Sequence, residues 1–121
     1  MNSNARVNDA RLFYLAEQIV SNLPIGSAAL EEHEALDKIA FIFEDSIKCS
    51  EVKGEAGAGI LVSNGKVVGF TVGEFSSFHA DDITDKEVLF MMICLDRPGF
   101  AEALYQLIVR FEAKDPQQNL H

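Results

Sequence analysis

The residues with the clearest chemical potential lie within residues 74–87, the most acidic interval of the chain. His79, Asp81, Asp82 and Asp85 place an imidazole and three carboxylates in one short stretch, a set of ligands suited to a divalent cation. The stretch lacks the alternating oxygen ligands and the closing Glu of a calcium loop, and no second His cluster supports a zinc site. We therefore interpret it as a solvated acidic loop and predict no metal site.

Asp81, Asp82, Asp85 and Glu87 carry most of the negative charge of this interval, in which Lys86 is the single cation. A run of carboxylates on a loop creates a negative potential that steers a basic partner and weakens as salt is added. We therefore predict these four carboxylates as candidate partner-binding residues, for a protein partner with a basic or neutral surface. The alternative is that they only keep a rather apolar protein in solution.

Candidate nucleophiles and acid–base pairs are few. Cys94 lies in an apolar run, where a free cysteine behaves as a small hydrophobic residue, whereas Cys49 follows Lys48 and is expected to be more exposed and more reactive. Glu87 and Asp96 flank the same apolar run and could act as base and acid, although capping an element is the commoner role. The sequence contains no Ser-His-Asp order, phosphate loop or CxxC motif. Catalytic residues therefore stay unidentified, and we expect binding rather than catalysis.

Length and composition set the class of protein. At 121 residues, of which 48% are hydrophobic, the chain has the size of one domain with a single core, so we predict one domain over residues 1–121 with flexible termini at 1–8 and 116–121. The net charge of −9 disfavours nucleic acid and anionic membranes as partners, because both require clustered Lys and Arg. Nine phenylalanines in so short a chain predict more apolar surface than one domain hides, and hence a homodimer.

The expected compartment follows from what the sequence lacks. No apolar run approaches the roughly 18 to 20 residues of a membrane-spanning helix, and residues 1–8 lack the apolar centre of a signal peptide. Two cysteines are too few for a disulfide framework, so both are expected to be reduced thiols. We therefore expect a cytoplasmic protein.

The elements are organised around residues 57–75, GAGILVSNGKVVGFTVGEF, in which two apolar, β-rich runs flank the dipeptide Asn64-Gly65. A two-residue type I′ turn needs positive φ at both central positions, and Asn and Gly supply it most easily. The stretch therefore predicts a β-hairpin, and the acidic interval is the connection that follows it.

Helices are predicted on both sides of this hairpin. Apolar residues recur with helical period over residues 9–22 and again over residues 100–114. Strong helix formers and a continuing helical period also favour a helix over residues 27–47, with a short strand at 39–43 as the alternative. Residues 50–58 are interpreted as a loop because glycines punctuate them.

The apolar run at residues 87–95 is nearly continuous, which is typical of a strand buried on both faces. The predicted fold class is thus α+β with the order α-α-β-β-β-α, its helices packed on a mainly antiparallel sheet of three or more strands. The predicted core comprises Leu61, Phe70, Phe90, Ile93, Leu104, Leu107 and Phe111.

This element order resembles the first half of the GNAT superfamily of N-acetyltransferases over residues 9–114. In that family a strand opens into a loop of the form Q/R-x-x-G-x-G/A, whose backbone amides at a helix N-terminus hold the pyrophosphate of acetyl-CoA. The matching positions are Asp96-Arg97-Pro98-Gly99-Phe100-Ala101, with Asp96 in place of Gln or Arg and with Pro98 lacking an amide hydrogen. The resemblance implies acetyl-CoA as cofactor, bound by Arg97, Gly99 and Ala101, as the alternative to a module without a cofactor.

Overall fold

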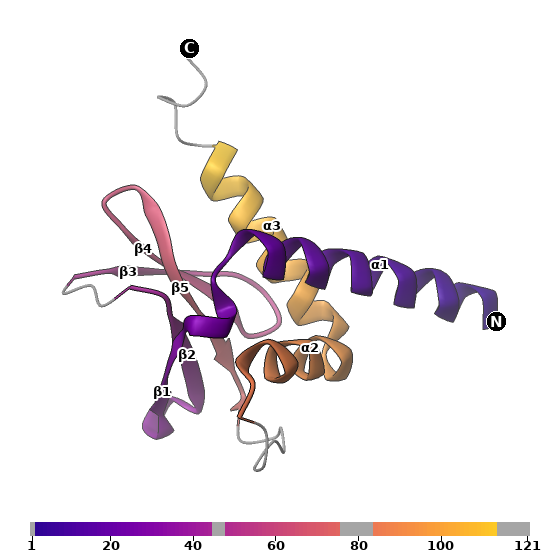
Figure 1. Ribbon diagram of the computed structural model, residues 1–121, viewed down its shortest axis with the longest axis horizontal. Coiled ribbons are helices and arrows are strands. Elements are labelled where there is room, and N and C mark those ends of the chain that lie inside the picture. The colour runs from indigo at the N-terminus through magenta and orange to yellow at the C-terminus, as the bar shows by residue number, and fades with distance from the viewer. Residues whose placement is uncertain (1, 45–47, 76–83, 114–121) are drawn as a thin grey trace.

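The computed structural model describes residues 2–44, 48–75 and 84–113, with side chains from Ala10 to Glu112. Within these residues, three α-helices lie on one face of a five-stranded antiparallel sheet (Figure 1). The helices are α1 (Asn2–Asn22), α2 (Lys86–Asp96) and α3 (Pro98–Ala113). The strands are β1 (Ala29–His33), β2 (Lys38–Ile42), β3 (Ser50–Lys53), β4 (Ala58–Ser63) and β5 (Lys66–Gly73), in the sheet order β1-β2-β5-β4-β3.

The predicted hairpin is confirmed as β4 and β5, joined at Asn64 and Gly65 with φ values of 53° and 79°. Both turn residues therefore adopt the left-handed conformation that a type I′ turn requires. A register shift between Leu61 and Val62 marks a β-bulge in this pair. Because β5 also pairs with β2, the hairpin supplies the centre of the sheet.

The prediction of a helix over residues 27–47 is wrong. This stretch forms two antiparallel strands, β1 and β2, with a short 3₁₀ turn (Ile25–Ser27) before them and another (Glu34–Leu36) between them. Asp37 closes the connection in the left-handed conformation, with φ of 53°. Packing overrides helix propensity here, because β2 lies between two strands and its run KIAFI is buried at its three central residues.

Two further expectations are wrong. Residues 87–95 belong to helix α2 instead of a buried strand, because a short apolar run without periodicity fits either element and Asp85 caps a helix here. Residues 50–53, expected in a loop, form the edge strand β3, which pairs with β4. The general α+β class holds, but the observed order α-β-β-β-β-β-α-α replaces the predicted α-α-β-β-β-α.

Helices α1 and α3 contain the predicted helical periods with shifted bounds, α3 covering residues 98–113 where 100–114 is predicted. Helix α1 ends at Asn22 as expected but begins at Asn2, where a loose terminus was predicted, and its first turns project beyond the other helices (Figure 1). Helix α3 begins at Pro98, a favourable first helical residue. A bidentate ion pair from Arg11 to Glu102, with both contacts at 3.1 Å, links the two helices. This pairing with Arg11 holds the pKa of the Glu102 carboxyl below its ordinary value.

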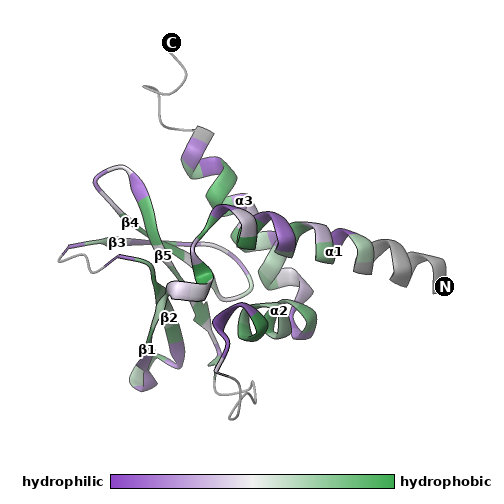
Figure 2. Cartoon of the chain, in the orientation of Figure 1, coloured by the Kyte–Doolittle hydropathy of each residue, from purple (hydrophilic) through white to green (hydrophobic). Residues whose placement is uncertain are grey.

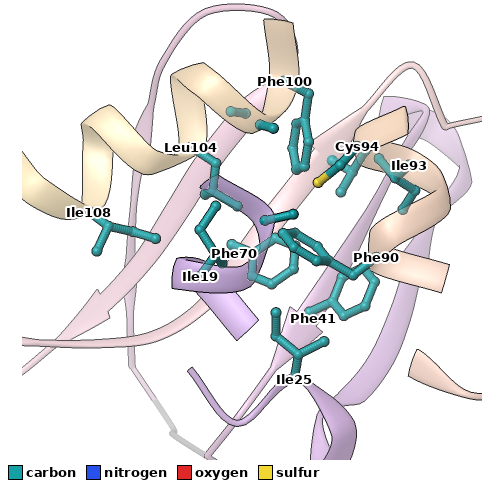
Figure 3. Close-up of a cluster of buried hydrophobic side chains, with 14 of the residues drawn as sticks. Ile19, Ile25, Phe41, Phe70, Phe90, Ile93, Cys94, Phe100, Leu104 and Ile108 are labelled. Atoms are coloured by element: carbon teal, nitrogen blue, oxygen red, sulfur yellow. The ribbon is translucent and has the colours of Figure 1, made fainter. Parts of the chain in front are cut away.

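One hydrophobic core joins the helices to the sheet (Figure 3). Phe70 of β5 stacks on Phe41 of β2 with ring centroids 4.5 Å apart, and the ring of Phe90 from α2 meets it edge-on at 5.5 Å. Phe100 of α3 closes the aromatic cluster. All four rings are fully buried, and such pairs contribute beyond their buried area. The helices are thereby fixed to one face of the sheet.

Candidate functional site

The predicted partner-binding carboxylates fall into two groups. Asp81 and Asp82 lie outside the described residues. Asp85 is the N-cap of α2, where its Oδ1 accepts hydrogen bonds from the backbone amides of Glu87 (2.9 Å) and Val88 (3.1 Å). Glu87 is exposed in the first turn of the same helix. Asp85 therefore has a structural task that does not depend on a partner.

The residues implied by the acetyl-CoA alternative lie close in sequence but face different surroundings. The Arg97 guanidinium donates to the backbone carbonyls of Gly73 and Glu74 and so ties the turn between α2 and α3 to the end of β5. Ala101 is fully buried in the core. Gly99, in the first turn of α3, lines a hollow of about 620 Å³. The structure thus does not gather the three residues around one cavity.

The strongest candidate surface is the face of the sheet opposite the helices, here called the open face. Alternation along the strands sends Ile39, Phe41, Ile60, Phe70 and Val72 into the core and their neighbours to the other side. No described helix covers these neighbours. The open face consists of Glu31 and His33 from β1, Lys38, Ala40 and Ile42 from β2, Gly69, Thr71 and Gly73 from β5, Gly59 and Leu61 from β4, and Glu51 and Lys53 from β3.

Small residues line the middle of the open face. A Cβ on Gly59 would lie 2.5 Å from Thr71 Oγ1 and 3.0 Å from Glu51 Oε2, and a Cβ on Gly69 would meet the Phe41 carbonyl. Ala40 is the third small residue in this central part. Longer side chains of the same and neighbouring strands surround these small residues, and the hollows of this face lie among them.

A polar network crosses this hollow from β2 to β3. Glu51 receives one hydrogen bond from the Lys38 ammonium at 2.7 Å and another from the Thr71 hydroxyl at 2.8 Å. Thr71 is 3% exposed, while the Lys38 and Glu51 side chains are 17% and 22% exposed. Partial burial raises the pKa of the Glu51 carboxyl, but the hydrogen bonds from Lys38 and Thr71 together with the positive charges of Lys38 and Lys53 outweigh it, so the net pKa lies below its ordinary value. Glu51 is therefore held as a carboxylate across the face.

The network divides the open face into two hollows, of about 380 and 230 Å³. Lys38, Glu51 and Thr71 line both of them, and so does Leu36, whose side chain is 65% exposed at the rim. The larger hollow also has an apolar side formed by Ile42 and Leu61. Antiparallel sheets usually turn an alternating, polar face to water. This mixture of apolar and fixed polar groups is instead typical of a contact surface.

Both cysteines are free, as predicted. Cys94 is fully buried in α2 against the core, and this burial raises the pKa of its thiol to about 12. Cys49 is exposed and lines the larger hollow of the open face. The core position of Cys94 and the exposure of Cys49 are confirmed, whereas the higher reactivity of Cys49 stays a prediction. Cys49 is a natural chemical reporter of the open face.

The residues of the network carry no local signal in the sequence. The sequence predicts a helix at Lys38 and a loop at Glu51, whereas their contact depends on the register of the strands β2, β5, β4 and β3. The spacing of Gly59, Gly69 and Gly73 on two paired strands was the one available clue, because glycine within a strand often marks a close approach of another group.

Comparisons with protein-family models, with curated proteins and with solved structures find no match. Among the described helices, none combines the length and the apolar character needed to cross a membrane. Nor do the described residues contain three His, Cys, Asp or Glu side chains placed to hold a metal ion.

Proposed function

We propose that this protein is a small acidic binding module without catalysis, which contacts a protein partner through the open face of its sheet. The single observation that carries the proposal is the asymmetry of the sheet: three helices cover one face, while the other bears a hollow with the apolar side chains of Ile42 and Leu61 beside the Lys38–Glu51 pair. Pockets with a few fixed polar groups on an apolar surface are suited to recognition. The Lys38–Glu51 pair fixes orientation, and Leu36, Ile42 and Leu61 supply apolar contact.

The charge of the chain sets the chemistry of the partner. At −9, the protein attracts basic surfaces and repels acidic ones, so the partner surface is basic or neutral. The carboxylates at Asp81, Asp82, Asp85 and Glu87 would add to this attraction. Replacing the three aspartates with Asn separates attraction from folding, because Asn serves as an N-cap as well as Asp does. The triple variant is expected to melt like the wild type, associate more slowly and show a flatter salt dependence.

The test of the open face uses the purified chain as bait in an extract of its native host, with captured proteins quantified by mass spectrometry. Leu36→Glu and Leu61→Glu place a charge on the open face, and Val109→Glu makes the same change at a 41% exposed position on α3. A partner held by the open face is captured by the wild type and by Val109→Glu but is lost from both open-face variants. Capture that is equal for all four proteins, at unchanged melting temperature, would refute the proposal.

The alternative function is binding of acetyl-CoA, as the GNAT resemblance implies. The observation that favours it is the position of Gly99 at the start of α3, on a hollow that also holds the cations Lys53 and Arg110. Glu55 and Glu102 line the same hollow and would oppose a phosphate. A thermal-shift measurement tests acetyl-CoA binding, because a ligand at about 100 times its Kd stabilises the fold that binds it by about 2.7 kcal/mol. An unchanged melting temperature at millimolar acetyl-CoA removes this alternative.

Two more features belong to the proposal. We place the module in the cytoplasm, where its free thiols stay reduced, and cell fractionation tests this location. We also expect it to act as a homodimer, whose mass in solution light scattering would measure.

A further inference from the structure

Strand β1 is an exposed edge of the sheet (Figure 1). It pairs with β2 along all of its five residues, and within the part of the chain that the structure describes no strand lies on its other side. Residues 29–32 are exposed, and His33 is half-buried. Strand β1 contributes none of the residues of the hydrophobic core. What it offers is therefore a row of backbone groups and accessible side chains.

The hydrogen bonds of β2 show which backbone groups of β1 point outward. The Phe43 amide donates to the Val68 carbonyl at 2.8 Å, in the register that β2 and β5 share. In an antiparallel ladder, every second residue of a strand bonds to the same neighbour. Ile39 and Phe41 therefore bond to β5. The alternate residues of β2, which bond to β1, are Lys38, Ala40 and Ile42.

The register carries this alternation to β1. Ala29, Glu31 and His33 lie opposite those three residues and exchange hydrogen bonds with them. The amides and carbonyls of Leu30 and Glu32 consequently point away from β2, toward the outer edge. Such a row of backbone groups in extended geometry is a template for pairing with a further strand.

Side chains of β1 border a hollow on each side of the strand. Glu31 and His33 line the larger hollow of the open face, where the Glu31 carboxylate lies 2.9 Å from His33 Nε2. Glu32 turns to the other side and lines a hollow of about 280 Å³. The side chains that share this second hollow with Glu32 include Glu34, Asp37 and Phe75. Figure 2 shows the purple of hydrophilic residues around this turn between β1 and β2.

The charge on both sides of β1 is acidic. Lys38 lines both hollows, but its ammonium is paired with Glu51 at 2.7 Å. The Glu31 side chain is 59% exposed, and Glu32 is exposed as well. In a chain of net charge −9, this edge attracts a basic segment. It disfavours a second copy, because pairing two β1 edges would bring their carboxylates side by side.

The opposite edge of the sheet is protected in a way that β1 is not. Strand β3 has four residues, with Lys53 at its end and Lys48 shortly before its start. A short strand and lysine side chains are common means by which an edge avoids further pairing. Strand β1 contains neither lysine nor proline, and its charged side chains are acidic. Its edge is therefore closed to acidic segments and open to basic ones.

We propose that the partner adds an extended, basic segment to the outer edge of β1, as an additional strand of the sheet. This inference rests on the proposed function and specifies the form of the partner. Pairing with the backbone of Leu30 and Glu32 supplies affinity, and the alternating side chains of the segment supply specificity. Basic side chains on the open-face side meet Glu31. On the other side, the segment packs against Leu30, which is 39% exposed.

The first test uses a defined probe, a peptide of alternating Arg and Val that is long enough to span β1 and has blocked termini. Binding is measured by fluorescence anisotropy at low salt, where attraction between exposed charges is least screened. The Arg peptide should bind the wild type, and the same peptide with Glu in place of Arg should not. Absence of binding by the Arg peptide at about 1 mM, or equal binding of the two peptides, overturns the proposal.

A proline on β1 tests the backbone pairing. Leu30→Pro removes an amide that points away from β2, a position at which edge strands tolerate proline, so its melting temperature should stay close to that of the wild type. It should raise the Kd of the Arg peptide about fivefold to tenfold, whereas Leu30→Ala, which keeps the amide, should raise it less than about threefold. Equal effects of the two substitutions would show that the peptide does not pair with this edge.

Hydrogen exchange tests the same pairing without any substitution. In the wild type alone, the outward amides of Leu30 and Glu32 should exchange fast, and saturating Arg peptide should slow them by about tenfold or more. The Glu31 amide already bonds to β2 and should change less. Exchange at Leu30 and Glu32 that bound peptide leaves unchanged contradicts the added strand.

A comparison of variants separates this inference from the proposed function. In capture from the host extract, the partner should be lost from Leu30→Pro as well as from Leu61→Glu. Capture that Leu30→Pro retains and Leu61→Glu loses overturns the added strand and leaves the open face standing, whereas the reverse result removes the open face alone. A wild-type dimer in sedimentation equilibrium that Leu30→Pro abolishes would make a second copy the occupant of this edge and would also overturn the proposal.

Discussion

The two faces of the sheet are built from the same strands but differ in what buries their residues. On the covered face, Phe41, Phe70 and Val72 are fully buried under three helices. On the open face, their immediate neighbours Ala40 and Thr71 are also almost inaccessible, but what covers them is the fixed Lys38–Glu51 pair and the rim instead of a helix. Burial by packing stabilises the fold, whereas residues buried only under side chains of their own face lie next to a surface that a partner can use. The difference shows that low exposure alone does not distinguish core from site.

The largest effect on stability is expected from a substitution on the covered face. Phe70→Ala removes the ring on which Phe41 stacks and which Phe90 meets edge-on, and it leaves a cavity at the centre of the core. It should lower the free energy of unfolding by about 3 to 5 kcal/mol, measured by urea titration. A loss below about 1 kcal/mol would mean that the helices do not pack on this face as described.

A smaller effect on stability is expected at Gly69 on the open face, where β2 and β5 approach closely. Gly69→Ala would drive its Cβ against the Phe41 carbonyl and the Ile42 backbone, so β2 and β5 must shift apart. The cost should be about 1 to 3 kcal/mol in the same titration. Gly26→Ala is the matched control, because there the nearest atom is the flexible end of Glu87. Equal effects of the two substitutions would show that β2 and β5 do not approach so closely.

Loss of the Lys38–Glu51 pair should lower the free energy of unfolding by less than Gly69→Ala does, and its effect should depend on pH. Glu51→Gln loses the charge that Lys38 pairs with and should cost about 0.5 to 1.5 kcal/mol at neutral pH. The folded-state pKa of Glu51 is lowered, so its stabilising contribution is present above the unfolded pKa of about 4.3 and is lost as pH falls through the folded value. The difference between wild type and variant should therefore shrink below about pH 4. A difference that grows in acid has the wrong sign for this account.

The smallest effect on stability is expected at Leu36, at the rim of the open face. Leu36→Ser removes a 65% exposed side chain and should change the free energy of unfolding by less than about 0.5 kcal/mol. The same variant should nevertheless weaken capture of the partner. If it instead unfolds the protein, the rim belongs to the core and the contrast between the faces fails.

Sequence reasoning succeeded where local chemistry decides the structure. Asn64-Gly65 specified its turn, and the helical periods of α1 and α3 were visible without any tertiary information. Phe70, Phe90 and Leu104 were correctly expected in the core, whereas Leu61 was not, because alternation in β4 turns Ile60 inward and Leu61 to the open face. One position along a strand thus separates the core from the candidate site.

It failed where two elements suit the same residues. The helix-forming residues of β1 and the apolar run of α2 are each locally compatible with a helix or a strand. At β1, tertiary packing overrides the local helix propensity. The candidate site depends on this choice, since Lys38 reaches Glu51 only after β2, β5, β4 and β3 are aligned. No spacing in the sequence could have brought these two residues together.

The central claim is that a partner covers the open face, and Cys49 tests it most directly. This thiol is exposed beside the larger hollow, whereas Cys94 is fully buried with a raised pKa, so iodoacetamide added to the folded protein reports on Cys49. The alkylation rate is measured alone and with the captured partner, and Val109→Cys in a Cys49→Ser background supplies the reference for α3. The account predicts that the partner slows alkylation at Cys49 and leaves the reference rate unchanged. An unchanged rate at Cys49 in the presence of saturating partner would contradict it.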